Sequence, residues 1–421
     1  MARRYFGTDG VRGVVGEFLT PELVERLGRA AALWTGAQKV FVGRDTRASG
    51  AELQEAFARG IVSAGGDCFL GGVLPTPAVA LAALDLGVVI SASHNPPEYN
   101  GVKFFDSQGH KLPDAAEEQI EELLVAAPGI DLGRVEHVEI ATDSYMEHIL
   151  ERFGSDLSGL RVVVDCANGA YSGIAPRAFE LCGAKVHRIG DAPDGANINV
   201  GCGATDLALL QQTVCELGYD VGFAFDGVGD RMLAVDERGE VVDGDQIVAI
   251  LALDQKVDQV AVTVMTNLGF HALMREHGIV VHTTDVGDRY VLEALQREGA
   301  LLGGEQSGHI IYLRDHVTGD GLAAGLLLCA ALDGRPLSDA AAVMPRFPQV
   351  KENVRVATNA LTPAILAEIE RVNAEWDGQG RVLVRPSGTE PLIRVLVEAQ
   401  NAQVAEEACA SIASLVRREL G

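Results

Sequence analysis

Strand-like and helix-like segments alternate along this chain, and the alternation restarts twice. The first round contains a helix pattern over 20–34, a strand over 39–43 and a later helix from about Thr76 to Gly87. Comparable rounds begin with strand-like residues 161–165 and with a helix near Gln246. Strands that alternate with helices predict mainly parallel sheets with right-handed crossovers. We therefore expect three related α/β domains, each built on a mixed sheet.

The last part of the chain has a different order of segments. After Pro348 we expect a strand, a helix over about 361–374, two strands at 381–385 and 392–398, and a final helix over about 402–418. Two strands with no helix between them predict an antiparallel pair, and hence a smaller C-terminal α+β domain. The predicted domains cover residues 1–142, 143–244, 245–347 and 348–421.

The acidic composition argues against one class of partner. The chain has 34 basic and 59 acidic residues, which gives a net charge of −25. Nucleic-acid binding depends on neutralising phosphates, so we expect no DNA or RNA partner. A small phosphorylated ligand remains compatible with this charge, because it needs only a local cluster of donors.

The cysteines and the apolar runs indicate a cytoplasmic protein. Seven cysteines occur without any C-x-x-C pair, which argues against a zinc site and a disulfide framework. The first ten residues, MARRYFGTDG, contain no apolar segment of a signal peptide. The longest apolar run, residues 321–332, is too short to span a bilayer, so we expect no membrane association.

Two glycine-rich polar loops follow predicted buried strands in the first two domains. Ser91-Ala-Ser93-His-Asn-Pro is followed closely by Lys103, so a rigid serine and an amine could serve one cleft. An ordinary turn explains the same residues. In Asp226-Gly-Val-Gly-Asp230-Arg231, two carboxylates can converge on a small hard cation. Solvated aspartates in a turn are the simpler alternative there.

Two further loops occupy the third and fourth domains. Gly304-Glu-Gln-Ser-Gly-His309 offers an acceptor, an amide and a hydroxyl, a set that suits the hydroxyls of a sugar. A hairpin turn and a structural histidine are the alternatives. Arg385-Pro-Ser387-Gly-Thr389-Glu-Pro combines a guanidinium with hydroxyls and exposed amides, which is the composition of an anion site.

Taken together and in this order, the loops resemble those of the α-D-phosphohexomutase superfamily, and within it the bacterial phosphoglucosamine mutases. The matching segments are residues 5–13, 91–96, 226–231, 286–291, 304–309 and 385–391, so the resemblance spans the whole chain. It implies four domains around a central cleft. It also implies an enzyme that moves a phosphoryl group between the 6 and 1 positions of a hexose, through a bound 1,6-bisphosphate.

The resemblance also implies a role for each loop. Ser93 matches the phosphoserine, and Mg2+ would bind Ser93, Asp226 and Asp230. The residues near the reacting groups would be Arg12, Lys103, Arg231 and His309, with Lys103 and His309 as the candidates for proton transfer. The sugar would contact Glu305, Gln306 and Ser307. The non-reacting phosphate would contact Arg385, Ser387, Gly388 and Thr389.

Within the loop over residues 304–309, the residue at position 306 differs between family members that act on different sugars. Gln306 is typical of the mutases that act on glucosamine phosphates, whereas the glucose and mannose enzymes tend to carry Met at that position. The implied ligand is a hexosamine phosphate, with glucosamine 1,6-bisphosphate or glucose 1,6-bisphosphate as activator. Its product would supply UDP-N-acetylglucosamine and the cell wall. A phosphomannomutase or phosphoglucomutase is the alternative, and a homodimer is compatible with the family.

One position departs from the family pattern. The metal loop of the family reads D-G-D-G-D-R, and here the middle aspartate is Val228. Valine has no side-chain oxygen, so either water fills the vacant position or the metal binds poorly. Weak magnesium binding in an active enzyme is our expectation. A weakly active or non-catalytic paralogue that still binds sugar phosphates is the alternative.

Overall fold

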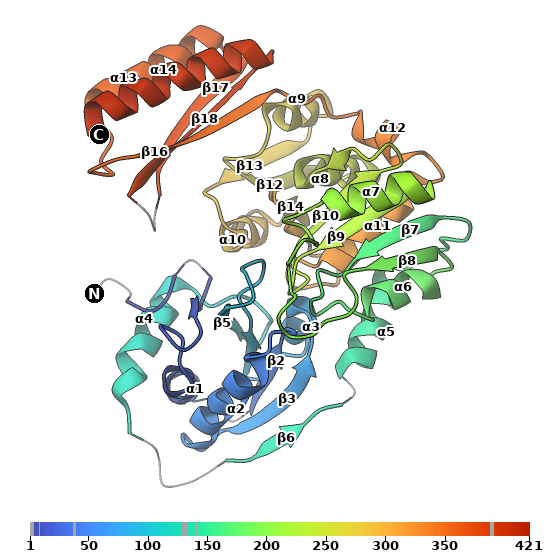
Figure 1. The fold of residues 1–421 in the computed structure, drawn as a ribbon, viewed down its shortest axis with the longest axis vertical. Helices are drawn as coiled ribbons and strands as arrows, with labels where there is room; N and C mark the ends of the chain where they lie inside the picture. The colour runs from blue at the N-terminus through green and yellow to red at the C-terminus, as the bar shows by residue number, and fades with distance from the viewer. Residues whose placement is uncertain (1–3, 8, 37–38, 128–132, 140, 388–390) are drawn as a thin grey trace. The chain divides into compact units, whose positions relative to one another are not determined.

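The structure is a computed structural model that describes the chain except residues 1–3, 8, 37–38, 128–132, 140 and 388–390. The chain forms two compact units. Unit 1 consists of residues 1–265 and 279–342, and unit 2 consists of residues 266–278 and 343–421. Figure 1 colours the chain from the N-terminus to the C-terminus and labels the elements used below.

The first part of unit 1 is built on a six-stranded mixed sheet of order β1-β5-β4-β2-β3-β6. The strands β2, β3, β4 and β6 are parallel to one another, whereas β5 runs antiparallel to both β4 and β1. Their bounds are β1 (Val11–Val14), β2 (Lys39–Arg44), β3 (Asp67–Val73), β4 (Leu86–Ile90), β5 (Tyr99–Asp106) and β6 (Val135–His137). The helical segments are α1 (Pro21–Thr35), α2 (Gly50–Val62), α3 (Thr76–Leu81), α4 (Asp114–Glu122) and the 3-10 turn η1 (Leu123–Val125).

Local patterns predict α1 correctly and α3 only in part. Thr20 is the N-cap of α1, and its hydroxyl accepts a hydrogen bond from the Leu23 amide at 3.3 Å. The helix predicted to run to Gly87 ends instead at Leu81, and this prediction is wrong at its end. Gly87 belongs to β4, where a side chain would lie 3.4 Å from Phe105 Cβ. Pairing with β2 and β5 therefore places Gly87 in a strand, although the local sequence favours a helix there.

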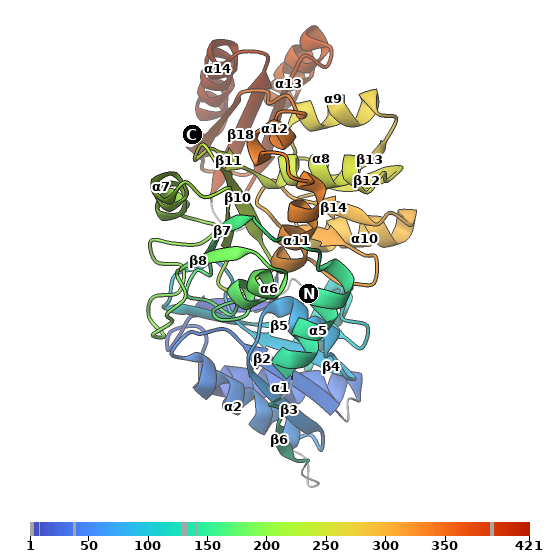
Figure 2. The same ribbon diagram turned by 90° about the vertical axis from the view of Figure 1, so that its right-hand side faces the viewer.

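Two further mixed sheets complete unit 1. The five-stranded sheet has the order β11-β10-β9-β7-β8, and the four-stranded sheet has the order β13-β12-β14-β15. Strand bounds are β7 (Arg161–Asp165), β8 (Lys185–Ile189), β9 (Val221–Phe225), β10 (Met232–Asp236), β11 (Val241–Val242), β12 (Gln259–Thr263), β13 (Val280–Thr284), β14 (Leu302–Gly304) and β15 (Ile310–Tyr312). Helix bounds are α5 (Ala141–Phe153), α6 (Ala175–Leu181), α7 (Ala208–Leu217), α8 (Gly244–Asp254), α10 (Asp288–Glu298), α11 (Gly321–Leu332) and α12 (Leu337–Ala341). Figure 2 shows α5 and α11 in a view turned by 90° from that of Figure 1.

Unit 2 contains an antiparallel sheet of order β16-β18-β17. Its strands are β16 (Gln349–Arg355), β17 (Gly380–Pro386) and β18 (Leu392–Ala399), and its helices are α9 (Leu268–Glu276), α13 (Pro363–Trp376) and α14 (Ala402–Leu420). Apolar side chains of β17, β18 and α14 form its core. The predicted fold class is confirmed: three mixed α/β sheets are followed by a smaller α+β part.

All four motif loops connect antiparallel neighbours. They lie between β4 and β5, β9 and β10, β14 and β15, and β17 and β18. The first three of these loops follow strands that also pair in parallel with β2, β7 or β12. Each of these loops therefore stands at the carboxyl end of a parallel strand, where α/β sheets bind ligands.

The most apolar helices among the described residues, α8 and α11, are almost entirely buried. α11 is the most apolar, and nearly all of its residues are buried. No helix among the described residues combines the length and apolar character needed to cross a bilayer.

Candidate active site

Ser93 stands in a rare backbone conformation at the carboxyl end of β4. Its φ is 53°, in the left-handed region that serine seldom adopts, and its side chain is buried. The Ser93 hydroxyl donates a hydrogen bond to Asp226 Oδ2 at 2.5 Å. Conformations of this kind persist where the surrounding structure holds them, and they cluster at functional sites.

The aspartate loop, residues 226–231, carries two buried carboxylates, those of Asp226 and Asp230. Asp226 Oδ1 accepts a hydrogen bond from the Arg231 amide at 3.2 Å, and Gly229 has a φ of 77° that lets the loop turn. Burial, followed by the charge of Asp230, raises the pKa of Asp226 to about 7. Asp230 Oδ1 is buried and has no hydrogen-bond partner among the described residues. Both observations indicate a place for positive charge.

Alternating charges surround these carboxylates. Lys103 Nζ lies 3.3 Å from Asp230 Oδ2 and 3.1 Å from Asp9 Oδ2. Burial raises the pKa of Asp230, but Lys103, His309 and Arg231 outweigh it and hold that pKa well below its usual range. The carboxylates of Asp230 and Asp226 in turn raise the pKa of Arg231 against the effect of burial.

This series of alternating charged side chains, here called the charge chain, continues from Lys103 through Asp9 and Lys111 to Asp288 and His309. Lys111 Nζ lies 2.6 Å from Asp9 Oδ1 and also contacts Asp288. His309 Nε2 is 3.6 Å from Asp288 Oδ2. Arg12 contacts Asp9, and its Nε is buried without a partner among the described residues. The predicted residues Ser93, Lys103, Asp226, Asp230, Arg231, Arg12 and His309 are thus linked by direct contacts or by shared carboxylates.

The sugar loop, residues 304–309, is the turn of the β14–β15 hairpin, and a hairpin turn was one of the two alternatives for this segment. Glu305 is buried and accepts a hydrogen bond from the Gly287 amide at 3.1 Å. Gln306 Nε2 donates to Asp245 Oδ2 at 3.4 Å. Ser307 is exposed, and the Met232 amide binds the Gly308 carbonyl at 2.9 Å. A backbone donor from the start of α10 and carboxylate oxygens from the start of α8 and from the hairpin itself therefore meet at this loop.

The fourth motif loop belongs to unit 2 and is described only in part. Arg385 lies in β17, and Ser387 follows the end of that strand. The Ser387 hydroxyl is buried without a hydrogen-bond partner among the described residues. Gly388 and Thr389 lie outside the described residues. An unsatisfied buried hydroxyl calls for an explanation, and a bound anion would supply one.

The whole chain matches one family of enzymes. Residues 3–127, 143–239, 243–347 and 352–415 match phosphoglucomutase/phosphomannomutase domains I, II, III and the C-terminal domain, respectively. A phosphoglucosamine mutase of Moorella thermoacetica is 49% identical over 97% of this chain and 98% of the relative. One from Symbiobacterium thermophilum is 50% identical over 99% of both chains.

Solved structures agree with this assignment. A phosphoglucomutase/phosphomannomutase family protein from Burkholderia thailandensis has 25% identity and a TM-score of 0.84, with 97% of each chain covered. The chain belongs to the phosphoglucomutase/phosphomannomutase family. It is therefore a phosphohexomutase, an enzyme of the isomerase class.

Phosphohexomutases use Mg2+, and the residues of this chain fit a magnesium site with one ligand fewer. Asp226, Asp230 and the Ser93 oxygen would supply hard ligands, and Asp230 Oδ1 has no hydrogen-bond partner among the described residues. Val228 is fully buried, and its carbonyl accepts a hydrogen bond from the Thr76 amide at 2.9 Å. No cluster of three or more His, Cys, Asp or Glu side chains suited to a metal occurs among the described residues.

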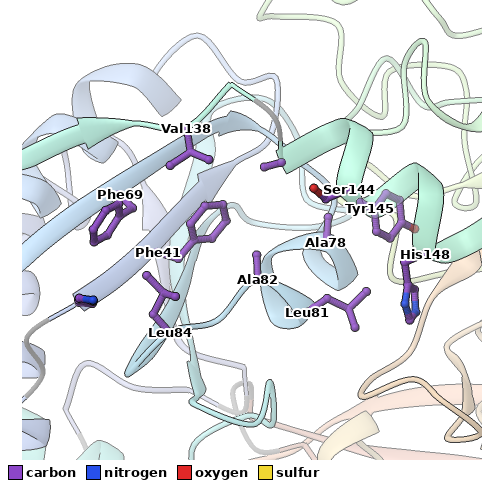
Figure 3. A pocket seen from close by; sticks show the side chains of 12 residues that line it. Phe41, Phe69, Ala78, Leu81, Ala82, Leu84, Val138, Ser144, Tyr145 and His148 are labelled. Atoms are coloured by element: carbon purple, nitrogen blue, oxygen red, sulfur yellow. The ribbon is translucent and has the colours of Figure 1, made fainter.

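An apolar hollow lies apart from the motif loops of this phosphohexomutase. It has a volume of about 590 Å3 and is lined by Phe41, Phe69, Leu81, Tyr145 and His148, among others (Figure 3). None of the residues that line it belongs to the motif loops. The candidate site is thus defined by converging polar groups and not by the apolar hollow.

Sequence reasoning missed several residues that the structure places at the site. Lys111 carries no motif signal, because its partners Asp9 and Asp288 lie 102 and 177 residues away. Arg47 and Asn199 both bind the serine loop, residues 91–96, although they lie 46 and 106 residues from Ser93 in the sequence. Such residues are found only once the fold has brought distant segments together.

Proposed function

We propose that this protein is a phosphoglucosamine mutase, which interconverts glucosamine 6-phosphate and glucosamine 1-phosphate. The observation that carries the proposal is the buried Ser93 hydroxyl, in contact with Asp226 and next to the charge chain around Lys103. The relatives that share about half of its residues over nearly their whole length carry this name, which supports the amino-sugar substrate.

The proposed chemistry uses Ser93 as a covalent carrier. In the phosphorylated protein, the bond between Ser93 Oγ and phosphorus breaks while a sugar hydroxyl oxygen bonds to the same phosphorus. The proton of that hydroxyl passes to a base and the departing Ser93 oxygen takes up a proton from an acid, and Lys103 and His309 are the candidates for these two roles. The resulting 1,6-bisphosphate turns in the site and returns its other phosphoryl group to Ser93. Arg12 and Arg231 supply positive charge to the phosphoryl oxygens during both transfers.

Magnesium would be held by Asp226, Asp230 and the Ser93 oxygen. When bound, it offsets the negative charge that gathers on the transferred group. Glucosamine 1,6-bisphosphate, or glucose 1,6-bisphosphate, would act as activator by phosphorylating Ser93 in protein that has lost its phosphate.

Sugar recognition would combine acceptors and an amide. Glu305 and Asp245, the partner of Gln306, offer carboxylate oxygens to a 2-ammonium group, and Ser307 offers a hydroxyl. The phosphate that does not react would bind Arg385, Ser387, Gly388 and Thr389. The Arg385 guanidinium and the Ser387 hydroxyl, which is buried without a hydrogen-bond partner among the described residues, form a suitable pair of donors for that phosphate.

A mutase assay with three substrates tests the proposal. With Mg2+ and a hexose 1,6-bisphosphate, turnover should be fastest on glucosamine 6-phosphate and slower on glucose 1-phosphate and mannose 1-phosphate. Ser93→Ala should lower turnover by more than about a thousandfold, because the covalent carrier is lost. Ser172→Ala, a serine outside the motif loops, serves as control. Equal rates on the neutral sugars would instead indicate a phosphoglucomutase or phosphomannomutase.

Val228 motivates a second candidate function, a non-catalytic sugar-phosphate-binding protein. Intact-mass spectrometry separates the two. A single phosphate on Ser93 that glucosamine 6-phosphate removes supports the mutase, whereas a Ser93 that never carries phosphate supports the binding protein.

A further inference from the structure

A fully buried arginine lies beneath the serine loop. Arg47 Nη2 donates hydrogen bonds to the carbonyl oxygens of Ser93 at 3.0 Å and Asn95 at 2.7 Å, and Nη1 donates to the carbonyl of Pro96. These acceptors are backbone atoms, so the guanidinium recognises the path of the loop and not its side chains. Both donors of Nη2 and one donor of Nη1 are used in these bonds and the side chain is fully buried, which leaves it poorly placed to bind a phosphate itself.

A second set of bonds ties the Ser93 amide to the same arginine. Asp45 Oδ2 accepts hydrogen bonds from Arg47 Nε at 2.9 Å and from the Ser91 hydroxyl at 2.6 Å. The Ser91 oxygen in turn accepts a bond from the Ser93 amide at 2.9 Å. Both backbone polar groups of Ser93 are therefore joined, through buried side chains, to one ion pair.

The segment between β8 and α7 contributes a further donor. Asn199 Nδ2 binds the Ser93 carbonyl at 2.9 Å and the Asn95 carbonyl at 3.2 Å. Asn199 itself has a φ of 59°, and its amide is held by the Ala167 carbonyl. The serine loop is thus held by hydrogen bonds from the loop after β2 and from the loop that precedes α7.

We propose that Arg47 and Asn199, with Asp45 and Ser91, form a serine-loop clamp that holds Ser93 in its left-handed conformation for phosphoryl transfer. This inference rests on the proposed function. Phosphoryl transfer needs the serine oxygen, phosphorus and sugar oxygen nearly in line, and a displacement of about 1 Å can cost about a hundredfold in rate. Ser93 has no intrinsic preference for its φ, so external bonds must maintain that geometry.

Arg47 and Asn199 are positioning residues in this account, because they touch neither the substrate nor the reacting atoms. Their loss should slow the transfer step and leave sugar binding almost unchanged. A purely structural role would instead lower the fraction of folded protein and the melting temperature. It would leave the rate constant of the folded molecules as it was.

Two substitutions separate these roles. Asn199→Gly keeps a residue that accepts positive φ but removes the amide donor. Arg47→Lys keeps a cation beside Asp45 but cannot reach all three carbonyls. The matched controls are Asn168→Gly, another asparagine with positive φ that does not touch the loop, and Arg29→Lys, a buried arginine elsewhere in unit 1.

The measurement is a single turnover of full-length protein labelled with 32P on Ser93 and mixed with saturating glucosamine 6-phosphate. We expect the rate constant for label transfer to fall about 10- to 100-fold in Asn199→Gly and Arg47→Lys, with KM within about twofold and both controls near wild type. If Arg47→Lys unfolds, Asn199→Gly alone decides. Wild-type rate constants in both folded variants, or equal losses in the controls, would overturn the clamp. Failure of wild-type Ser93 to pass its label to any hexose phosphate would instead contradict the proposed function.

Discussion

Val228 places a buried hydrocarbon at the centre of the aspartate loop, where the family pattern has an aspartate. Its neighbours Asp226 and Asp230 already repel each other enough to contribute to the raised pKa of Asp226. A single side chain thus sets how many charges the loop offers to a cation, and how much repulsion the loop bears when no cation is present.

Val228→Asp should tighten Mg2+ binding on the order of tenfold, because cation affinity rises with the number of charged ligands. Calorimetric titration of the purified protein measures this. The same variant should melt at a lower temperature without Mg2+ and recover when it is added, since a third buried carboxylate adds repulsion. Val228→Asn, which adds an oxygen without charge, should fall between. An unchanged Mg2+ affinity in Val228→Asp would show that position 228 does not face the cation.

His271 makes the stability of unit 2 depend on pH. Burial, with the charges of Arg381 and Arg275, lowers the pKa of His271 to about 4, against about 6.5 in an unfolded chain. Between these values the unfolded state binds more protons, so stability falls as pH drops from about 6.5 to 4, by up to about 3 kcal/mol. His271→Gln should flatten the melting temperature over this range. His277→Gln, an exposed histidine at the end of the same helix, is the control, and an equal flattening there would contradict the assignment.

At the scale of elements, α11 shows how one carboxylate can organise a buried helix. Asp320 is its N-cap and accepts bonds from the amides of Leu322 at 2.9 Å and Ala323 at 3.0 Å. The hydroxyls of Tyr145 and Tyr171 donate to the same carboxylate at 2.8 Å and 2.7 Å. The helix start is therefore tied to α5 and to the loop before α6.

Asp320→Ala should destabilise unit 1 by about 3–5 kcal/mol, because it removes a cap and leaves two buried hydroxyls with only each other as partner. Asp243→Ala, which removes the N-cap of α8, should cost only about 1 kcal/mol. Urea denaturation compares the two. Equal losses would mean that the tyrosine hydroxyls find other partners.

Local patterns predicted the elements whose own residues favour them. The β7 strand was predicted with the bounds that it has, since its three consecutive valines favour a strand. The end of α3 was wrong and β5 was not predicted, because both depend on pairing with strands that are distant in sequence. The motif loops gave candidates for the site, but Lys111 and Asn199 carry no local signal. Their roles come from partners about a hundred or more residues away.

At the scale of the whole molecule, the chain carries separate apolar cores. One is built from residues of the first sheet and its helices, including Leu27, and belongs to unit 1. Another is built from the antiparallel sheet and its helices, including Ile393, and belongs to unit 2. The two tryptophans of the chain divide in the same way, since Trp34 packs on the first core and Trp376 on the second. Each core thus carries its own fluorescent reporter.

These reporters test whether the units unfold independently, as chains with several cores often do. In a Trp34→Phe background, Trp376 fluorescence reports unit 2, and Ile393→Ala should lower the urea midpoint by the equivalent of about 2–5 kcal/mol. In a Trp376→Phe background, the same substitution should leave the Trp34 midpoint almost unchanged, and Leu27→Ala should shift it instead. Coincident shifts of both reporters would contradict independent unfolding. The reason would then be that loss of either core exposes enough apolar surface to unfold the whole chain in one step.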